Sequence, residues 1–285
     1  LADGSRVREE LGLAVDTPVI GDIAYFYPPA NTAGLLPPRL LGRGIKGHDV
    51  LIRAVPHVLK SLPDAKFVLV GRGWGTGGPK YEQELNDLAN SLGVNHAILF
   101  PGERSDIPDV LAAFDISVQC SLSDNLGGTV ETLLMAKPLV VSDIGGFADT
   151  VLHEETGLVV PVDDPAALAE AIVRLLRDRA LGARLGENGR RRMLERFTLA
   201  RTVADTETLL AVRRRTTERH YRIGVSVART ATLPIRLFPM FLGVYRGLRR
   251  HGFSIPRFVR RRVRRAIGRG IAAVRGPRVT ASGPA

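Results

Sequence analysis

The chain has 285 residues, of which 45% are hydrophobic, 6% aromatic and 24% charged, and these values are ordinary for a soluble α/β protein. The single cysteine, Cys120, excludes an intramolecular disulfide framework and fits a reducing compartment; we expect it to be a buried residue at the end of an apolar strand. The chain begins with Leu1 and no charged-then-apolar signal segment follows, so we expect it to start inside a longer protein.

The net charge of +11 is distributed unevenly along the chain. Residues 213–285 contain 19 arginines and one acid, Glu218, which gives this segment a charge of +18 and leaves −7 for residues 1–212. A mildly acidic body is therefore followed by a strongly basic tail. Such asymmetry indicates an anionic partner for the tail, either a membrane surface or nucleic acid.

Apolar runs alternate with helical patterns from residue 19 to residue 197, after a short amphipathic helix and a linker in residues 1–20. The expected strands are Val19–Tyr27, Lys66–Val70, Ala97–Phe100, Ile116–Cys120, Leu139–Ser142 and Leu158–Val160. The expected helices are His48–Lys60, Lys80–Ser91, Asp106–Ala113, Thr129–Ala136, Ala148–Leu152, Pro165–Arg177 and Leu181–Phe197. Strands spaced by single helices predict a Rossmann-like, doubly wound parallel sheet with its ligand at the carboxyl ends of the strands.

Residues 121–146 contain the most informative motif of the chain. The acid Asp124 stands beside the pair Gly127-Gly128, a helical run with Glu131 in its first turn follows, and Gly145-Gly146 comes after a short strand. Glycines let the backbone approach a ligand closely, and a helix start offers free N–H groups to a diphosphate. Glu131 can accept hydrogen bonds from a ribose diol. The alternative is that Asp124 or Asn125 caps a helix and the second glycine pair is only a turn.

This segment resembles the donor-binding signature of the retaining GT-B glycosyltransferases of the "group one" superfamily, and the resemblance extends from about residue 5 to about residue 212. The family usually has two glutamates separated by seven residues. Here Asp124 and Glu131 are separated by six, and Ser123 stands at the seven-residue spacing. The resemblance implies that Glu131 holds the ribose, that Asp124 or Asn125 contacts the transferred sugar, and that the two acids are the candidate catalytic residues.

The segment from Arg43 to His48 contains Lys46-Gly47 and looks like the Lys-Gly element of the same family, in which the lysine binds the donor diphosphate. Lys46, Arg43 and the N–H groups of Gly127, Gly128 and Thr129 are therefore the candidate diphosphate ligands. The family's arginine usually stands five residues before the lysine, where this chain has Leu41. For His48 we expect a structural role.

Two further loops belong to this prediction. Residues 71–79 contain a literal Gly-x-Gly-x-x-Gly pattern, but no acid ends the following strand, which disfavours NAD; we expect Gly71 to border the donor site instead. Residues 101–108 correspond to the family's base-recognising loop, where Arg104 either contributes backbone contacts to the base or is a surface charge. No Asp-x-Asp element and no His/Cys cluster occur, so we expect neither a metal nor another cofactor.

The tail has two apolar parts. Residues 223–248 are interrupted by arginines and prolines, which argues against a simple transmembrane helix. In residues 257–275, apolar side chains recur at steps of three and four among eight arginines, a pattern typical of a basic amphipathic helix in a membrane interface. A disordered basic tail and a nucleic-acid-binding segment are the alternatives.

Taken with the resemblance, these features predict a hinge or linker in residues 1–17, a sugar-nucleotide-binding domain in residues 18–212 and a basic tail in residues 213–285. The implied activity is transfer of a hexosyl group, with retention, from a nucleoside diphosphate sugar to a glycan or lipid-linked acceptor in polysaccharide biosynthesis. We expect a cytoplasmic protein, peripheral on an anionic inner membrane face, that lacks its amino-terminal acceptor domain or receives it from a partner subunit. A non-catalytic sugar-nucleotide-binding module and a sugar-nucleotide epimerase stay open; a nucleic-acid-binding protein would rest on the tail alone.

Overall fold

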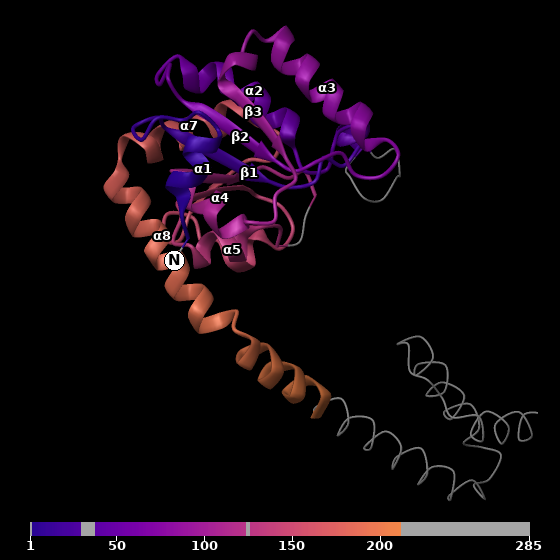
Figure 1. Cartoon of the computed structure of the whole chain (residues 1–285). Coiled ribbons are helices and arrows are strands. Elements are labelled where there is room, and N and C mark those ends of the chain that lie inside the picture. Colours follow the sequence, from indigo (N-terminus) through magenta and orange to yellow (C-terminus); the bar gives the residue numbers. More distant parts are fainter. Residues whose placement is uncertain (1, 30–37, 124–125, 212–285) are drawn as a thin grey trace, which may run out of the picture. The chain divides into compact units, whose positions relative to one another are not determined.

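The computed structural model describes residues 2–29, 38–123 and 126–211, and only the backbone of Arg39 (Figure 1). Contacts between residues divide the chain into two units, residues 1–202 and 203–285. Asp124, Asn125 and the predicted membrane helix of residues 257–275 lie outside the described residues.

The first unit contains a parallel sheet whose six described strands run in the order β3-β2-β1-β4-β5-β6. The strands are β1 (Val19–Ile23), β2 (Lys66–Val70), β3 (Ile98–Gly102), β4 (Ile116–Gln119), β5 (Leu139–Ser142) and β6 (Leu158–Val160). The chain moves outward from β1 to β3 and then crosses back to β4 on the other side of β1. The predicted doubly wound parallel sheet is confirmed.

Helices cover both faces of this sheet (Figure 1). They are α1 (Gly4–Glu10), α2 (His48–Leu59), α3 (Gly78–Ser91), α4 (Ile107–Ala113), α5 (Thr129–Leu134), α6 (Phe147–Thr150), α7 (Pro165–Arg177) and α8 (Arg179–Arg196), with 3₁₀ turns at Pro38–Leu40 and Asn95–Ala97. Helices α2, α3 and α7 lie on one face, and α1, α4, α5 and α6 lie on the other, while α8 contributes Leu181 and Leu185 to the first core and Met193 to the core beside α5 and α6. Residues 199–211 are also helical.

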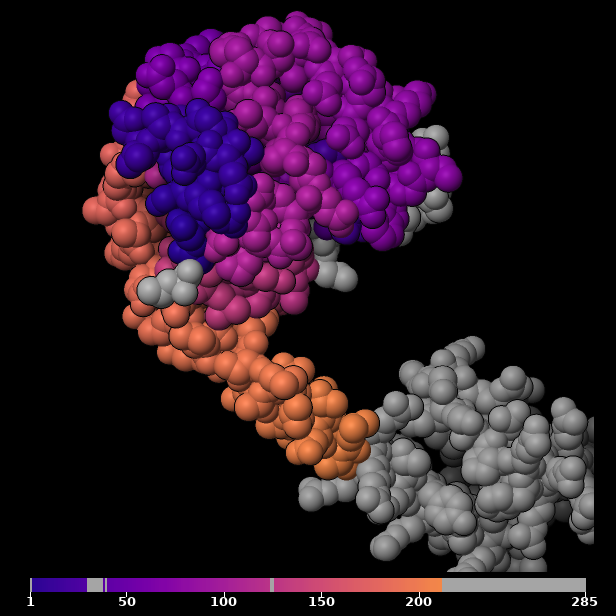
Figure 2. Space-filling view, in the orientation of Figure 1, coloured from indigo at the N-terminus to yellow at the C-terminus, as the bar shows by residue number. Residues whose placement is uncertain are grey.

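Successive strand residues point to opposite faces, and both faces are buried. In β2, Phe67 and Leu69 belong to the core under α2, α3 and α7, whereas Val68 and Val70 belong to the core under α1 and α4. Burial on both faces explains why the strands are continuous apolar runs rather than alternating ones. Val7 of α1 packs into the second core, and the space-filling view shows the indigo amino-terminal segment against the magenta surface of the body (Figure 2).

Local capping chemistry sets several helix boundaries. Asp164 caps α7 through a 2.9 Å hydrogen bond from the Ala167 N–H, and Pro165 is the first helical residue, as the sequence predicts. Asp178 caps α8 in the same way, so this helix begins at Arg179 and not at Leu181. Helix α5 ends two residues earlier than predicted, and Ala136 beyond it has a positive φ of 53°.

Strand β1 is shorter than the predicted Val19–Tyr27 and ends at Ile23. The apolar run continues in the sequence, but the ladder does not, and beyond Ile23 only an isolated parallel bridge joins Phe26 to Gly73. Phe26 is fully buried, while Tyr25 and Tyr27 on either side are partly exposed.

Candidate functional site

The topological switch point of the sheet lies between β1 and β4. These strands are neighbours, but the connection that leaves β1 leads to β2 and the one that leaves β4 leads to β5, on opposite sides. Connections diverging from adjacent strands leave a crevice at the carboxyl edge, which is where doubly wound sheets bind ligands. The segment containing Lys46 follows β1, and the segment containing Gly127-Gly128 follows β4. Both predicted diphosphate-binding segments are therefore brought to the same crevice.

The loop that contains Lys46, which we call the lysine loop, is hydrogen-bonded to the segment that follows β4. The carbonyl of Ile45 accepts hydrogen bonds from the N–H groups of Leu122, at 2.7 Å, and Ser123, at 3.3 Å. Gly47 has a φ of 70°, and a Cβ at this position would lie 2.1 Å from the carbonyl oxygen of Cys120. Only glycine fits both the left-handed conformation and this approach. The glycine after Lys46 thus brings the lysine backbone against the residues that precede Asp124.

A line of buried polar side chains runs between the two loops beneath the carboxyl edge of the sheet. Gln119 at the end of β4 donates from Nε2 to Asp22 Oδ1 over 3.5 Å and accepts at Oε1 from the Gly128 N–H over 3.4 Å. Asp22 in β1 is 2% exposed, and its Oδ2 lies 3.6 Å from His48 Nε2. Polar groups in an apolar interior are costly unless they interact with one another. These contacts link the first residue of α2 to the glycine loop after β4.

His48 is held as a neutral ring. It is 1% exposed and packs edge-on against Phe26 with 4.7 Å between the ring centroids. Burial, followed by the nearby charge of Lys46, lowers the pKa of His48 to about 3. A histidine that is buried and neutral at physiological pH serves packing and positioning, which is the role the sequence indicated.

The glycine loop after β4 is described from Leu126 onward. Gly127 has a φ of 50°, and Gly128 precedes the first residue of α5. Within the described residues, the Thr129 N–H donates to the Leu126 carbonyl at 3.2 Å, and the Gly128 N–H is engaged by Gln119. Glu131 lies exposed in the first turn of α5. The roles assigned to these residues remain predictions.

Arg43 lies in a structural ion cluster. Its Nε donates to Asp49 Oδ2 at 2.6 Å and its Nη2 to Asp163 Oδ1 at 2.9 Å. Burial raises the pKa of the Asp49 carboxyl, and the charge of Arg43 opposes that shift. The guanidinium therefore joins the loop before α2 to the loop before α7. Whether it also contacts a diphosphate stays a prediction.

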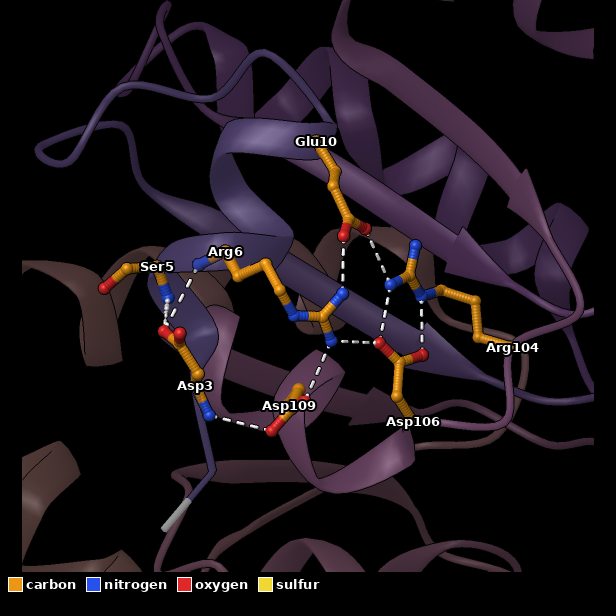
Figure 3. A network of polar contacts seen from close by, with 7 residues as sticks. All are labelled: Asp3, Ser5, Arg6, Glu10, Arg104, Asp106 and Asp109. Carbon is orange, nitrogen blue, oxygen red and sulfur yellow. Dashed lines mark hydrogen bonds and ion pairs between the residues drawn. The ribbon is translucent and has the colours of Figure 1, made fainter.

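Arg104 belongs to a second polar network, which joins α1 to the start of α4 (Figure 3). Its guanidinium donates to Asp106 at 2.6 and 2.8 Å and to Glu10 at 2.8 Å. Arg6 of α1 donates to Asp106 at 2.7 Å and to Asp109 at 2.9 Å. These hydrogen bonds hold the pKa of the Asp106 carboxyl well below its usual range. The Arg104 side chain thus fastens the predicted hinge helix to the predicted base-recognising loop.

The glycines of the loop after β2 are explained by packing of the chain on itself. A Cβ at Gly71 would lie 2.0 Å from the Ala24 carbonyl oxygen, and one at Gly73 would lie 2.2 Å from the backbone of Gly78. The Gly73 N–H donates to Glu82 of α3 at 3.0 Å. The mutual approach of Gly73 and Gly78, together with the positive φ of 64° at Gly75, accounts for the Gly-x-Gly-x-x-Gly pattern without a dinucleotide. Gly71 lies at the end of β2, on the ligand edge of the sheet, and its contact with the donor stays a prediction.

The described part of the chain contains neither a cluster of metal-binding side chains nor a membrane-spanning helix. Across residues 2–29, 38–123 and 126–211, no group of three or more His, Cys, Asp or Glu side chains is placed to hold a metal ion. In the same part of the chain, no helix has both the length and the apolar character needed to cross a membrane.

A doubly wound sheet whose loops meet at its switch point is the type of α/β domain that binds a ligand at the carboxyl edge of its strands. The family model "Glycosyl transferases group 1" matches residues 39–192. The chain belongs to this family, which confirms the resemblance drawn from residues 121–146 and the glycosyltransferase class.

Curated relatives match the chain over part of their own length. The chain is 32% identical over 165 residues to the lipopolysaccharide core biosynthesis mannosyltransferase LpsB of Rhizobium meliloti, a match that covers 56% of this chain and 47% of the relative. It is 34% identical over 196 residues to a GDP-mannose-dependent monoacylated alpha-(1-6)-phosphatidylinositol monomannoside mannosyltransferase of Corynebacterium glutamicum, covering 66% and 45%. The chain spans about half the length of the curated relatives it matches.

Solved structures agree with the fold. Anabaena Alr3699/HepE in complex with UDP-glucose matches with a TM-score of 0.61 and 27% identity over 73% of this chain and 52% of that one. The C-terminal domain of a glycosyl transferase group 1 family protein from Francisella tularensis matches with a TM-score of 0.55 over 70% of this chain and 95% of that one, and at 19% identity it shows the fold alone.

The sequence did not single out Asp22 and Gln119, nor the aromatic side chains at the crevice. A signal for the first two was present, because Asp22 lies inside an apolar strand and Gln119 is a polar residue at the end of a buried one. Tyr25 and Tyr27 were predicted to belong to the first strand, which was predicted too long, and Trp74 was considered only as part of a glycine-rich loop.

Proposed function

We propose that this chain is the donor-binding part of a retaining glycosyltransferase, which transfers a hexosyl group from a nucleoside diphosphate sugar to a glycan or lipid-linked acceptor. The observation that carries the proposal is the joining of the Lys46-Gly47 loop to the residues after β4 by the two hydrogen bonds to the Ile45 carbonyl. These bonds bring a lysine and a glycine loop to one crevice at the switch point.

The chemistry of this crevice suits a diphosphate leaving group. Negative charge builds on the diphosphate as the bond to the sugar breaks, and a fixed ammonium group stabilises that charge. Lys46 is the residue we place there, with Arg43, Gly127, Gly128 and Thr129 as further candidates and Glu131 on the ribose. Because a lysine supplies the positive charge, we propose that the diphosphate is bound without a metal ion or another cofactor.

The donor and acceptor classes follow from the relatives. The Corynebacterium glutamicum protein is named as GDP-mannose-dependent and as acting on a phosphatidylinositol monomannoside, and the Anabaena structure holds UDP-glucose. A guanosine or uridine diphosphate hexose and a lipid-linked acceptor are therefore the substrates that we propose for the whole protein. Since this chain spans about half of such relatives, the acceptor site is proposed to lie in the other half or in a partner subunit.

Calorimetric titration of the full chain with UDP and GDP, with and without EDTA, tests the proposal. We expect one nucleotide to bind with the same affinity in both conditions. Lys46→Ala should weaken binding about tenfold or more, because a hydrogen bond to a charged group is worth about 1.5–3 kcal/mol. Lys60→Ala, which changes an exposed lysine at the end of α2, is the matched control and should bind as the parent does.

Absence of binding to either nucleotide, or binding abolished by EDTA and restored by magnesium, would contradict the proposal. Nucleotide binding without hydrolysis or transfer, in the presence of a lipid-linked acceptor, would instead favour a non-catalytic module or one subunit of a split transferase. Interconversion of two nucleotide sugars would identify an epimerase.

A further inference from the structure

Three aromatic side chains gather at the carboxyl edge of the sheet, next to Lys46. Tyr25 and Tyr27 follow β1, and Trp74 lies in the loop after β2. We call Tyr25, Tyr27 and Trp74 the aromatic cluster. The ring centroids of Tyr25 and Trp74 are 4.8 Å apart, and those of Tyr27 and Trp74 are 5.5 Å apart.

The backbone holds this cluster in place. The Phe26 N–H donates to the Arg72 carbonyl at 2.9 Å, and the Trp74 N–H donates to the Phe26 carbonyl at 3.0 Å. The Phe26 ring points into the core and is fully buried. Because successive side chains of an extended segment point to opposite sides, Tyr25 and Tyr27 are turned away from that core. The cluster is therefore a preorganised feature of two hydrogen-bonded segments.

The Trp74 side chain is 48% exposed, even though its ring contacts the two tyrosine rings. Aromatic rings are among the side chains that gain most free energy from burial. A half-exposed tryptophan that is held in place beside the expected ligand site therefore offers a surface that a flat, apolar ligand can cover. The backbone hydrogen bonds hold the Trp74 main chain, and the contacts with Tyr25 and Tyr27 hold its ring, so the residue is placed to stack before any ligand arrives.

The surroundings of the cluster indicate which part of a ligand covers it. On one side, Lys46 Nζ lies 6.0 Å from the centroid of the Tyr27 ring. On the other side, the Tyr25 hydroxyl is hydrogen-bonded to Glu103, which follows β3 and also pairs with Arg72 at 2.6 Å. The cluster thus lies between the lysine proposed for the diphosphate and the loop predicted to meet the base.

We propose that the aromatic cluster, with Trp74 as its exposed ring, is the stacking platform for the nucleobase of the donor. The inference rests on the proposed function and adds the residue that binds the base. Every nucleobase has a π-face, and base–aromatic stacking tolerates different bases. The platform therefore supplies affinity for the nucleoside without selecting between uracil and guanine.

The protein carries its own reporter, since Trp74 is the single tryptophan of the 285 residues. Tryptophan emission of the full chain is titrated with UDP, GDP and inorganic pyrophosphate. We expect saturable quenching by a nucleoside diphosphate and none by pyrophosphate, which has the charge for Lys46 but no base. Calorimetry gives the affinity of the same ligands independently of emission.

Two substitutions complete the test. Trp74→Leu should weaken nucleoside diphosphate binding about tenfold and leave pyrophosphate binding unchanged, whereas Trp74→Phe should recover most of the loss. Leu92→Ala, which changes an exposed apolar residue at the end of α3, is the control for loss of apolar surface and should alter neither ligand.

The outcomes separate this inference from the proposed function. Nucleotide binding with unchanged Trp74 emission and no effect of Trp74→Leu overturns the platform while the donor site stands. Quenching by a nucleoside diphosphate sugar but not by the nucleoside diphosphate would assign the ring to the transferred sugar and overturns it as well. If neither UDP nor GDP binds by calorimetry, the proposed function fails and the platform falls with it.

Discussion

At the scale of single residues, the crevice is organised by polar side chains that the strands bury. Asp22 and Gln119 are each 2% exposed, and their contacts reach from His48 to the Gly128 N–H. Their separations of 3.4–3.6 Å are long for hydrogen bonds, so the individual contacts are weak and their value lies in fixing the two loops relative to each other. The sequence shows that these residues are polar positions in buried strands but not that they meet.

The two acids of the signature are distinguished by substitution. We expect Glu131→Ala to weaken nucleotide binding more than Asp124→Ala, because Glu131 keeps its place relative to the helix and Pro138 while the spacing to Asp124 is one short. Loss of a hydrogen bond from a charged group should cost about 1.5–3 kcal/mol, or tenfold and more in affinity. Calorimetry on both variants measures the difference.

Glu84→Ala, which removes a half-exposed carboxylate of α3, is the control for a change of charge alone. The two variants must unfold at the same temperature as the parent for the comparison to hold. A larger loss for Asp124→Ala would show that the alignment of the two acids is wrong.

His48 makes stability depend on pH. Its pKa in the folded protein is about 3, far below the ordinary value of 6.5, so between these values the unfolded chain binds a proton that the folded chain does not. The stabilisation is fully present above pH 6.5 and is lost as the pH falls toward 3. We expect the free energy of unfolding to decrease by up to about 1.4 kcal/mol per pH unit in this window.

Urea unfolding between pH 7 and pH 4.5 (about two units of the window) measures the slope. His48→Gln should flatten it, whereas His57→Gln, which changes an exposed histidine of the same helix, should not. Imidazole resonances provide a second measurement that needs no variant. A His48 ring that titrates near 6.5 in the folded protein would contradict the expectation.

At the scale of elements, the sequence predicts which helices and strands form better than it predicts where they end and which residues they bring together. Lys66–Val70, Leu139–Ser142, Leu158–Val160 and Pro165–Arg177 match the structure residue for residue, because apolar runs and an Asp-Pro start mark them. Strand β1 was predicted too long, since periodicity cannot distinguish a ladder from the single Phe26–Gly73 bridge. Arg43 was placed near the diphosphate, but its carboxylate partner Asp163 is 120 residues away and no local spacing indicates that pair.

The network around Arg104 fastens helix α1 to the body (Figure 3). We expect Arg104→Ala to accelerate amide hydrogen exchange in residues 4–10, because the bonds to Glu10 and Asp106 are lost. Nucleotide affinity should change by no more than about twofold, since a surface substitution outside a binding contact is worth within about 0.5 kcal/mol. Exchange mass spectrometry and calorimetry on one preparation test both statements.

Arg174→Ala is the matched control. Arg174 pairs with Glu154, so its loss should leave exchange in residues 4–10 as in the parent. A tenfold loss of nucleotide affinity in Arg104→Ala, with unchanged exchange in α1, would show that the Arg104 side chain binds the donor and that its contact with α1 is incidental.

At the scale of the whole molecule, charge separates the chain into an acidic body and a basic tail, and the tail lies outside the described residues. The charge of +18 in residues 213–285 and the apolar stripe of residues 259–274 together favour an anionic membrane as its partner. Each arginine near such a surface contributes at most about 1 kcal/mol, so we expect the eight in residues 257–275 to be enough for binding even with screening.

We expect the full chain to float with vesicles that contain anionic lipid, and the chain truncated after Val212 to stay in solution. Insertion of the apolar stripe should make this binding only partly sensitive to salt, whereas binding to nucleic acid falls by powers of ten over a few-fold rise in salt. Serine at Val263, Ile267 and Ile271 keeps every arginine and removes the stripe, so this variant should bind at low salt and dissociate as salt rises. Equal flotation of the truncated chain would overturn this expectation, because it would place the membrane-binding part in residues 1–212. Binding of the tail to nucleic acid alone would overturn it as well, because the apolar stripe would then have no role.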